Sequence, residues 1–202
     1  MENQGKGRKQ LILLIAFFVA PIILAVVMFN NMPADGPSST TNNGELVIPA
    51  RPLSDVNLTT LTGKIFKFSD LRKTWAMVYI GQSTCDKACA DTLYKMRQSR
   101  LAQRGEHLRI KRLYISTNGK AQASLTKILK QHPGLEFVYG DSAAIEAVVK
   151  QFMLEDKSSA KTAQRLYILD PLVNLMMSYE PGFDAKGLIE DMTKLLKISR
   201  IG

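Results

Sequence analysis

Cysteine and histidine are scarce in this chain of 202 residues, which contains only two of each. The sequence has no arginine–glycine tract, no basic run interleaved with aromatic residues and no internal repeat. Without such basic tracts, the net charge of +9 does not indicate a protein that binds nucleic acid. The charge fits a solvated basic surface, or one that faces an anionic membrane or an acidic partner protein.

One uncharged apolar segment, residues 11–29, is long enough to cross a hydrocarbon core of about 30 Å as a helix. Basic residues precede the segment and none follows closely, so the positive-inside rule places the tail, residues 1–10, in the cytoplasm. We therefore predict an uncleaved, single-pass transmembrane anchor. A cleaved signal peptide is the alternative, although its apolar region is usually shorter and Met32-Pro33-Ala34 is a poor cleavage site.

Residues 30–48 are rich in Asn, Ser, Thr, Pro and Gly, which predicts a flexible linker. Residues 49–202 are then one globular domain, long enough to bury a core. With the tail in the cytoplasm, the domain is expected on the far side of the membrane. In a Gram-negative bacterium this is the periplasmic side of the inner membrane, and a mitochondrial inner-membrane protein facing the intermembrane space would look similar.

Strand and helix patterns alternate along the domain. Short apolar or alternating runs predict strands at residues 56–59, 64–68, 75–80, 108–116, 136–139, 165–169 and 175–179. Apolar residues at helical spacing predict helices at residues 86–103, 121–131, 142–153 and 184–198. This order predicts an α/β fold of the thioredoxin-like kind, with a central β-sheet flanked by helices.

The two cysteines, Cys85 and Cys89, form the candidate site. They follow a predicted buried strand and begin a predicted helix, where the partial positive charge and free N–H groups stabilise a thiolate; Lys87 between them could help. Residues four apart in a helix have Cβ atoms about 5–6 Å apart, whereas a relaxed disulfide needs about 3.8 Å. A bond between the two therefore distorts the first turn or requires Cys85 to lie in the preceding loop. We predict a readily reduced, working disulfide.

The reduced pair also offers two soft thiolates on one face, which suit monovalent copper. A structural disulfide or two buried thiols is the alternative interpretation. It is the weaker one, because so short a loop closes little chain entropy and a bond across it stabilises the fold little. The motif CxxxC alone is weak, but its position between a strand and a helix in an exported, tethered domain makes it more specific.

The chain resembles the Sco/SenC family of cytochrome c oxidase assembly factors over residues 48–200. Besides the anchor and linker, the resemblance rests on Leu61-Thr62-Gly63-Lys64, the segment 81–89 (GQSTCDKAC), the strand 113–116 (LYIS) and the segment 165–171 (RLYILDP). The resemblance implies a thioredoxin-like fold and a role at the binuclear copper site of oxidase subunit II, either delivering copper(I) or reducing the cysteines of the site. It also implies that Cys85 and Cys89 match the family's cysteine pair, and that subunit II or other oxidase assembly factors are partners.

The chain departs from the family pattern at several positions. Asp86 and Ala90 stand where the family usually has a proline after each cysteine, and Asn118-Gly119 replaces an Asp-Pro. The family's third copper ligand is a histidine shortly before the late Asp-Pro, and counting back from Asp170 places Thr162 there. The usual Cys-Cys-His copper site is therefore not predicted.

No other residue replaces that histidine convincingly. We expect His107 and His132 to be surface or capping residues, and Met96 to pack in the core. Copper bound by Cys85 and Cys89 alone remains an alternative, and it would be weaker than in the family.

Two functions follow from these observations. The missing histidine favours a thiol–disulfide oxidoreductase, with Cys85 as the attacking thiolate and Cys89 as the resolving thiol. The alternative is a copper(I)-carrying chaperone or a non-catalytic assembly protein that uses the same cysteines. A peroxidase is a weaker hypothesis, because Gln82 occupies the position expected for a threonine before the reactive cysteine.

Overall fold

The computed structural model describes residues 3–31, 41–154 and 159–199, which form two compact units, residues 1–41 and 42–202. The first unit contains helix α1 (Asn3–Asn30). Its part Gly7–Asn30 is long and apolar enough to cross a membrane, and includes the predicted anchor. Residues 1–2 of the predicted tail and 32–40 of the predicted linker lie outside the described residues.

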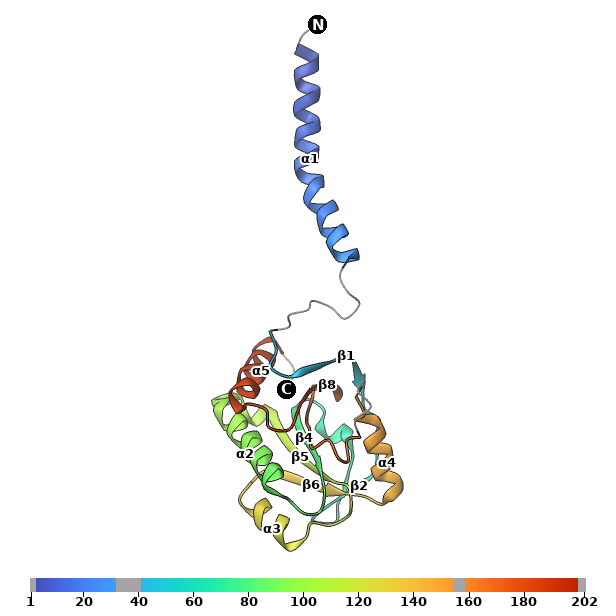
Figure 1. The fold of residues 1–202 in the computed structure, drawn as a ribbon, viewed down its shortest axis with the longest axis vertical. Coiled ribbons are helices and arrows are strands. Elements are labelled where there is room, and N and C mark those ends of the chain that lie inside the picture. Colours follow the sequence, from blue (N-terminus) through green and yellow to red (C-terminus); the bar gives the residue numbers. More distant parts are fainter. Residues whose placement is uncertain (1–2, 32–40, 155–158, 200–202) are drawn as a thin grey trace. The chain divides into compact units, whose positions relative to one another are not determined.

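The second unit is built around one eight-stranded sheet with the order β1-β8-β7-β4-β5-β6-β2-β3 (Figure 1). The strands are β1 (Glu45–Pro52), β2 (Leu58–Thr60), β3 (Ile65–Phe66), β4 (Trp75–Gly81), β5 (Ile110–Ser116), β6 (Leu135–Tyr139), β7 (Leu166–Leu169) and β8 (Asn174–Tyr179). Strands β4, β5 and β6 are parallel, whereas β7 runs antiparallel to both β4 and β8. This mixed sheet confirms the predicted α/β, thioredoxin-like fold.

Helices cover both faces of the sheet (Figure 1). They are α2 (Lys87–Ala102), α3 (Ala123–Lys130), α4 (Ser142–Gln151) and α5 (Ala185–Ile198), with short 3₁₀ helices η1 (Phe68–Leu71) and η2 (Arg104–Arg109). Every residue of β4 is buried, and its side chains alternate between the two faces. Met77 and Tyr79 pack on the side of α2, α3 and α5, while Val78 and Ile80 pack on the side of α4.

The linker was predicted as residues 30–48, but its last four residues are not part of a linker. Residues 45–48 belong to β1, which pairs antiparallel with β8 from Glu45 opposite Ser178. The preceding backbone is fixed by the buried carboxylate of Asp191, which accepts hydrogen bonds from the N–H groups of Asn43 (2.7 Å) and Gly44 (3.0 Å). The segment looks like a linker by composition, but contacts that are distant in sequence order it.

Candidate functional site

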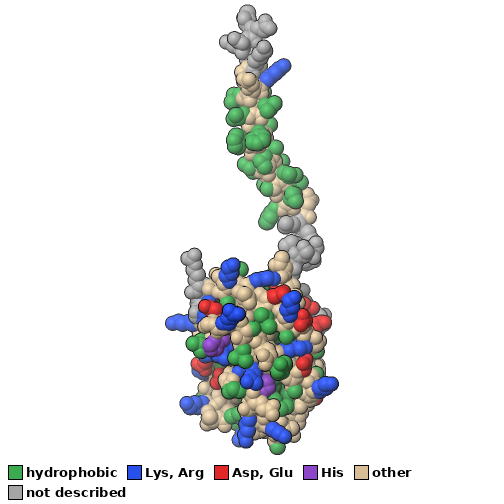
Figure 2. All heavy atoms as spheres, turned by 90° about the vertical axis from the view of Figure 1, so that its left-hand side faces the viewer, with side chains coloured by type: hydrophobic (Ala, Val, Ile, Leu, Met, Phe, Trp, Pro, Cys, Tyr) green, Lys and Arg blue, Asp and Glu red, His purple; other side chains and the backbone are tan. Residues whose placement is uncertain are grey.

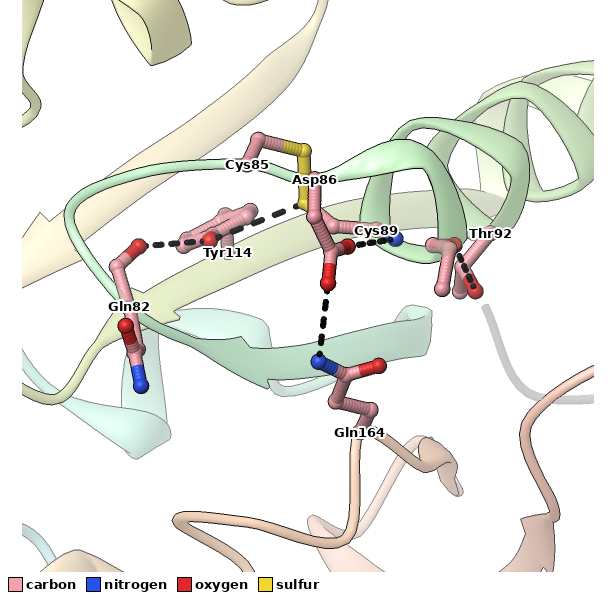
Figure 3. Close-up of a disulfide and its surroundings, with 8 residues drawn as sticks. Gln82, Cys85, Asp86, Cys89, Thr92, Tyr114 and Gln164 are labelled. Carbon is pink, nitrogen blue, oxygen red and sulfur yellow. Dashed lines mark hydrogen bonds between the residues drawn. A yellow bond between two sulfur atoms is a disulfide. The ribbon is translucent and has the colours of Figure 1, made fainter.

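Cys85 and Cys89 are joined by a disulfide at the junction between β4 and α2 (Figure 3). Cys85 lies in the loop after the strand, Asp86 caps the helix, and Cys89 lies in its first turn. The Cα atoms of the two cysteines are 5.3 Å apart. Of the two arrangements expected for such a bond, a distorted first turn or Cys85 in the preceding loop, the structure has the second.

The two cysteines differ in exposure. Cys89 is only 3% exposed and packs against the core beneath α2, whereas Cys85 is half-buried. A thiol or thiolate from solvent therefore reaches Cys85 more easily than Cys89.

Asp86 holds the junction together. One of its carboxylate oxygens accepts the backbone N–H of Cys89 at 2.8 Å, and the other accepts the side-chain amide of Gln164 at 3.4 Å (Figure 3). The first contact is the helix cap, which explains why α2 begins here. The carboxylate also interacts with the partial positive charge at the N-terminus of the helix. Sequence analysis expected this charge to stabilise a Cys85 thiolate instead. The exposed Lys87 does not outweigh a carboxylate bound directly to the helix N–H groups.

Two tyrosines form the base of the site. Tyr79 and Tyr114 are register partners on β4 and β5, and their ring centroids are 5.3 Å apart. The hydroxyl of Tyr114 donates to the backbone oxygen of Gln82 at 2.7 Å and lies 3.9 Å from the sulfur of Cys89. Burial, with a smaller contribution from the charge of Asp86, raises the pKa of both phenols well above the usual value. Both tyrosines therefore remain neutral at physiological pH.

A cavity of about 290 Å³ opens beside Cys89. Its lining residues come from β4, the loop before α2, the first turn of α2, β5 and the segment before β7: Tyr79, Gly81, Gln82, Thr84, Asp86, Cys89, Tyr114, Lys161, Thr162 and Gln164. Thr162 is thus part of the cavity wall. The position that the resemblance assigns to the copper-ligand histidine does face the site, and it carries a hydroxyl group.

The remaining candidate ligands lie elsewhere. His107 belongs to η2 and His132 follows α3, and neither lines the cavity. His132 is buried rather than on the surface, which corrects the expectation for that residue. Met96 is fully buried in the core, as predicted. Among the residues that the structure describes, no group of three or more His, Cys, Asp or Glu side chains could hold a metal ion.

Sequence analysis identified the two cysteines and Thr162 but missed the tyrosine pair and Gln164. The tyrosines read as ordinary core residues of two apolar strands. The only signal was that each tyrosine is the third residue from the end of its strand. This equal position makes the two tyrosines neighbours only if the two strands are parallel and adjacent, as they are in the structure. Gln164 gave no signal, because its contact with Asp86 joins segments 78 residues apart.

Family models match both units of the chain. Residues 75–199 match the model described as the transmembrane-like, thioredoxin-like C-terminal domain, and residues 2–30 match the transmembrane-like N-terminal domain. The chain belongs to this transmembrane-like, thioredoxin-like family. Membership fits one N-terminal helix that can span a membrane, followed by one thioredoxin-like domain. No curated protein matches the chain.

Solved structures of Sco proteins share the fold of the family's C-terminal domain. The copper-bound ScoI of Arabidopsis thaliana is 19% identical, with a TM-score of 0.61 over 72% of this chain and 98% of that one. The apo Sco1 of Thermus thermophilus is 14% identical, with a TM-score of 0.62 over 79% and 99%. BsSco, a Sco-family protein with a described disulfide switch, is 16% identical, with a TM-score of 0.57 over 77% and 99%. The predicted resemblance to Sco proteins is confirmed for the fold.

Proposed function

We propose that this protein is a Sco-like cytochrome c oxidase assembly factor that acts as a membrane-tethered thiol–disulfide reductase through Cys85 and Cys89. The observation that carries the proposal is the disulfide between a half-buried Cys85 in the loop and a buried Cys89 in the first helical turn. An accessible and an inaccessible sulfur at the end of a thioredoxin-like strand suit the division into attacking and resolving thiols.

The reaction starts from the reduced pair. The Cys85 thiolate attacks one sulfur of a target disulfide, which breaks that bond and releases the other target sulfur as a thiolate that takes up a proton. The Cys89 thiol then loses its proton and attacks Cys85 in the mixed disulfide, which releases the second target thiol. The target gains two electrons and two protons, and Cys85–Cys89 becomes the disulfide. A dithiol donor must then reduce the protein for another cycle.

The surroundings of the sulfur atoms support this assignment of roles. The Tyr114 hydroxyl donates its proton to the backbone oxygen of Gln82. The hydroxyl oxygen of Tyr114 can therefore accept a hydrogen bond from the S–H group of a reduced Cys89. This contact favours a protonated Cys89 until the mixed disulfide forms. The Asp86 carboxylate disfavours negative charge on either sulfur, which weakens the reduced form relative to the disulfide. A dithiol whose reduced form is destabilised is a stronger reductant.

Copper(I) transport is the second candidate, and the cavity suits it less well. Two thiolates are good ligands for copper(I), but the cavity adds hydroxyl and amide groups, including Thr162 and Gln164, which are hard donors. Cys85 and Cys89 would therefore hold the ion alone. The copper-bound Sco structures that share the fold are the reason to keep this candidate.

The proposed setting follows from the anchor and the fold. We place α1 in the inner membrane, with the N-terminus in the cytoplasm and the domain in the periplasm, because the basic residues precede the apolar segment. An oxidising compartment also gives a reductase disulfides to act on. The proposed partners are oxidase subunit II, whose copper-site cysteines must be reduced before metal binds, or other assembly factors.

Two assays on the full-length protein in neutral detergent separate the candidates. In the first, reduced protein is mixed with a peptide that contains one disulfide, and mixed disulfides are detected by mass spectrometry. Cys89→Ser should trap the peptide on Cys85, whereas Cys85→Ser should trap none. Equal trapping by both variants would contradict the assigned roles.

In the second assay, reduced protein competes for copper(I) with a chromophoric chelator. We expect weak binding that either serine variant abolishes. Tight one-to-one binding, together with no turnover of the peptide disulfide, would favour the copper carrier over the reductase.

A further inference from the structure

Arg112 is a buried cation on the face of the sheet that α2, α3 and α5 cover. It lies on β5 between the buried side chains of Ile110 and Tyr114 and is only 2% exposed. Its Nη2 group donates to the backbone oxygen of Pro133, in the turn after α3. Its Nε and Nη1 groups are also buried, and within the described part of the chain they have no acceptor.

Three further basic side chains surround Arg112. Arg97 and Arg100 are half-buried on α2, and Arg100 is positioned by a 2.8 Å hydrogen bond from its Nε to the backbone oxygen of Ile110. His132 is buried in the turn after α3, with no partner for its Nδ1 among the described residues. Burial, with the charges of Arg100 and Arg97, lowers the pKa of Arg112 to about 10. Burial, with the charges of Arg112 and Arg97, likewise lowers the pKa of His132.

These charges are not balanced by acidic residues. In the described part of the chain, none of the four side chains forms an ion pair with a carboxylate. Figure 2 shows this side of the domain, where basic side chains are more frequent than acidic ones in the lower part. Buried polar groups nearly always have partners, and an uncompensated buried charge destabilises a fold. The single hydrogen bond from Arg112 to Pro133 does not explain why three arginines and a histidine lie close together here.

We propose that Arg97, Arg100, Arg112 and His132 form a binding site for a phosphate-type anion, between α2 and the turn after α3. Arginine presents a rigid set of N–H donors that matches the oxygens of phosphate, and two such donors of Arg112 are unused. Arg97 and Arg100 are only half-buried, so the outer part of the cluster is accessible from solvent. A phosphate carries enough negative charge and enough acceptor oxygens to compensate several of these cations at once.

The site is distinct from the dithiol. Arg112 pairs with Met77 near the start of β4, whereas the cysteines follow Gly81 at its end, and none of the four basic residues lines the cavity beside Cys89. The proposal therefore does not depend on the redox function.

The test measures the unfolding temperature of the full-length protein in neutral detergent as sodium phosphate is titrated, against sodium chloride of equal ionic strength. A ligand that binds only the folded state raises this temperature. We expect phosphate, and not chloride, to stabilise the wild-type protein. The double variant Arg97→Gln/Arg100→Gln should weaken phosphate binding about tenfold or more, because two charge-assisted contacts are lost. Lys150→Gln, a charge change on α4 at the other face, should leave binding unchanged.

Arg112→Met should remove the phosphate response entirely, because it deletes the central cation while keeping a long side chain. If that variant does not fold, the double variant on α2 still decides the question. Equal stabilisation of the double variant and the wild type by phosphate overturns the proposal, and so does equal stabilisation of the wild type by chloride.

A second arm distinguishes a free phosphate from a lipid headgroup. The same variants are compared in nanodiscs of phosphatidylcholine alone and of phosphatidylcholine with phosphatidic acid. Stabilisation of the wild type but not the double variant by phosphatidic acid, without any effect of inorganic phosphate, keeps the site and assigns it to a lipid headgroup. No stabilisation in either arm overturns the proposal.

Discussion

Replacing Asp86 by asparagine should make Cys85 of the reduced protein more reactive without destabilising the fold. Asparagine caps a helix about as well as aspartate, so the hydrogen bond to the Cys89 N–H is retained. The substitution removes only the negative charge. Alanine at the same position removes the cap as well, and should lower the free energy of unfolding by about 1 kcal/mol.

The size of the effect follows from the position of the carboxylate. Asp86 is adjacent to Cys85 and its side chain turns back onto the helix N-terminus, so the charge lies close to either sulfur. Asp86 is exposed, so the dielectric constant is close to that of water, and two like charges about 5 Å apart repel by about 1 kcal/mol. Removing that repulsion should increase the thiolate fraction of Cys85, and its rate of alkylation near pH 7, about fivefold.

The assay is the rate of iodoacetamide alkylation in a Cys89→Ser background, in which Cys85 is the only thiol. Asp91→Asn is the matched control, because it removes a carboxylate from the same helix that already pairs with Lys95 at 2.7 Å. It should not change the rate. An Asp86→Asn rate equal to or below that of the background protein, with an unchanged unfolding temperature, would refute the electrostatic role of Asp86.

Three further predictions test the cavity, the core and the pH dependence. Thr162→His should tighten copper(I) binding in the chelator competition by adding a nitrogen ligand to the cavity wall, whereas Thr126→His on α3, which does not line the cavity, should not. Phe152→Ala should lower the free energy of unfolding in urea by about 3–5 kcal/mol, because this fully buried ring packs against two aromatic neighbours. Burial lowers the pKa of His132 below its unfolded value of 6.5, so the unfolded chain binds more protons and stability should fall as the pH drops below 6.5 towards the folded pKa. His132→Gln should flatten this part of the curve, measured in phosphate-free buffer; an equally steep curve would contradict the assignment.

Local patterns were enough to predict most of the fold. The apolar run before the cysteines is the fully buried strand β4, and the helix predicted from residue 86 is α2, which begins at Lys87 after the cap Asp86. These features depend on residues close in sequence. Strand β1 was missed and the burial of His132 was predicted wrongly, because both depend on distant contacts. Asp191 orders the backbone before β1 across 147 residues, and nothing near His132 in the sequence indicates the cover that buries it.

The candidate site was predictable in its position but not in its chemistry. The spacing of Cys85 and Cys89, with a strand before them and a helix after them, was sufficient to place the disulfide. The effect of Asp86 could not be inferred, since a helix N-terminus and Lys87 alone suggest a stabilised thiolate. Only the hydrogen bond from the Cys89 N–H to the Asp86 carboxylate shows that the helix end is already occupied by a negative charge.

The two main departures from the Sco pattern meet at one cavity. Asp86 replaces the proline after the first cysteine, and Thr162 replaces the histidine. Gln164, two residues after Thr162, donates to the Asp86 carboxylate, so the segment that would carry the histidine is bonded to the residue that replaces the proline. The proline could not make this bond, because it lacks a carboxylate. Under the proposed function, a threonine in place of the histidine leaves copper(I) with one ligand fewer. The carboxylate of Asp86 lowers the stability of the reduced pair relative to the disulfide, which makes the pair a stronger reductant although it slows the attack by Cys85.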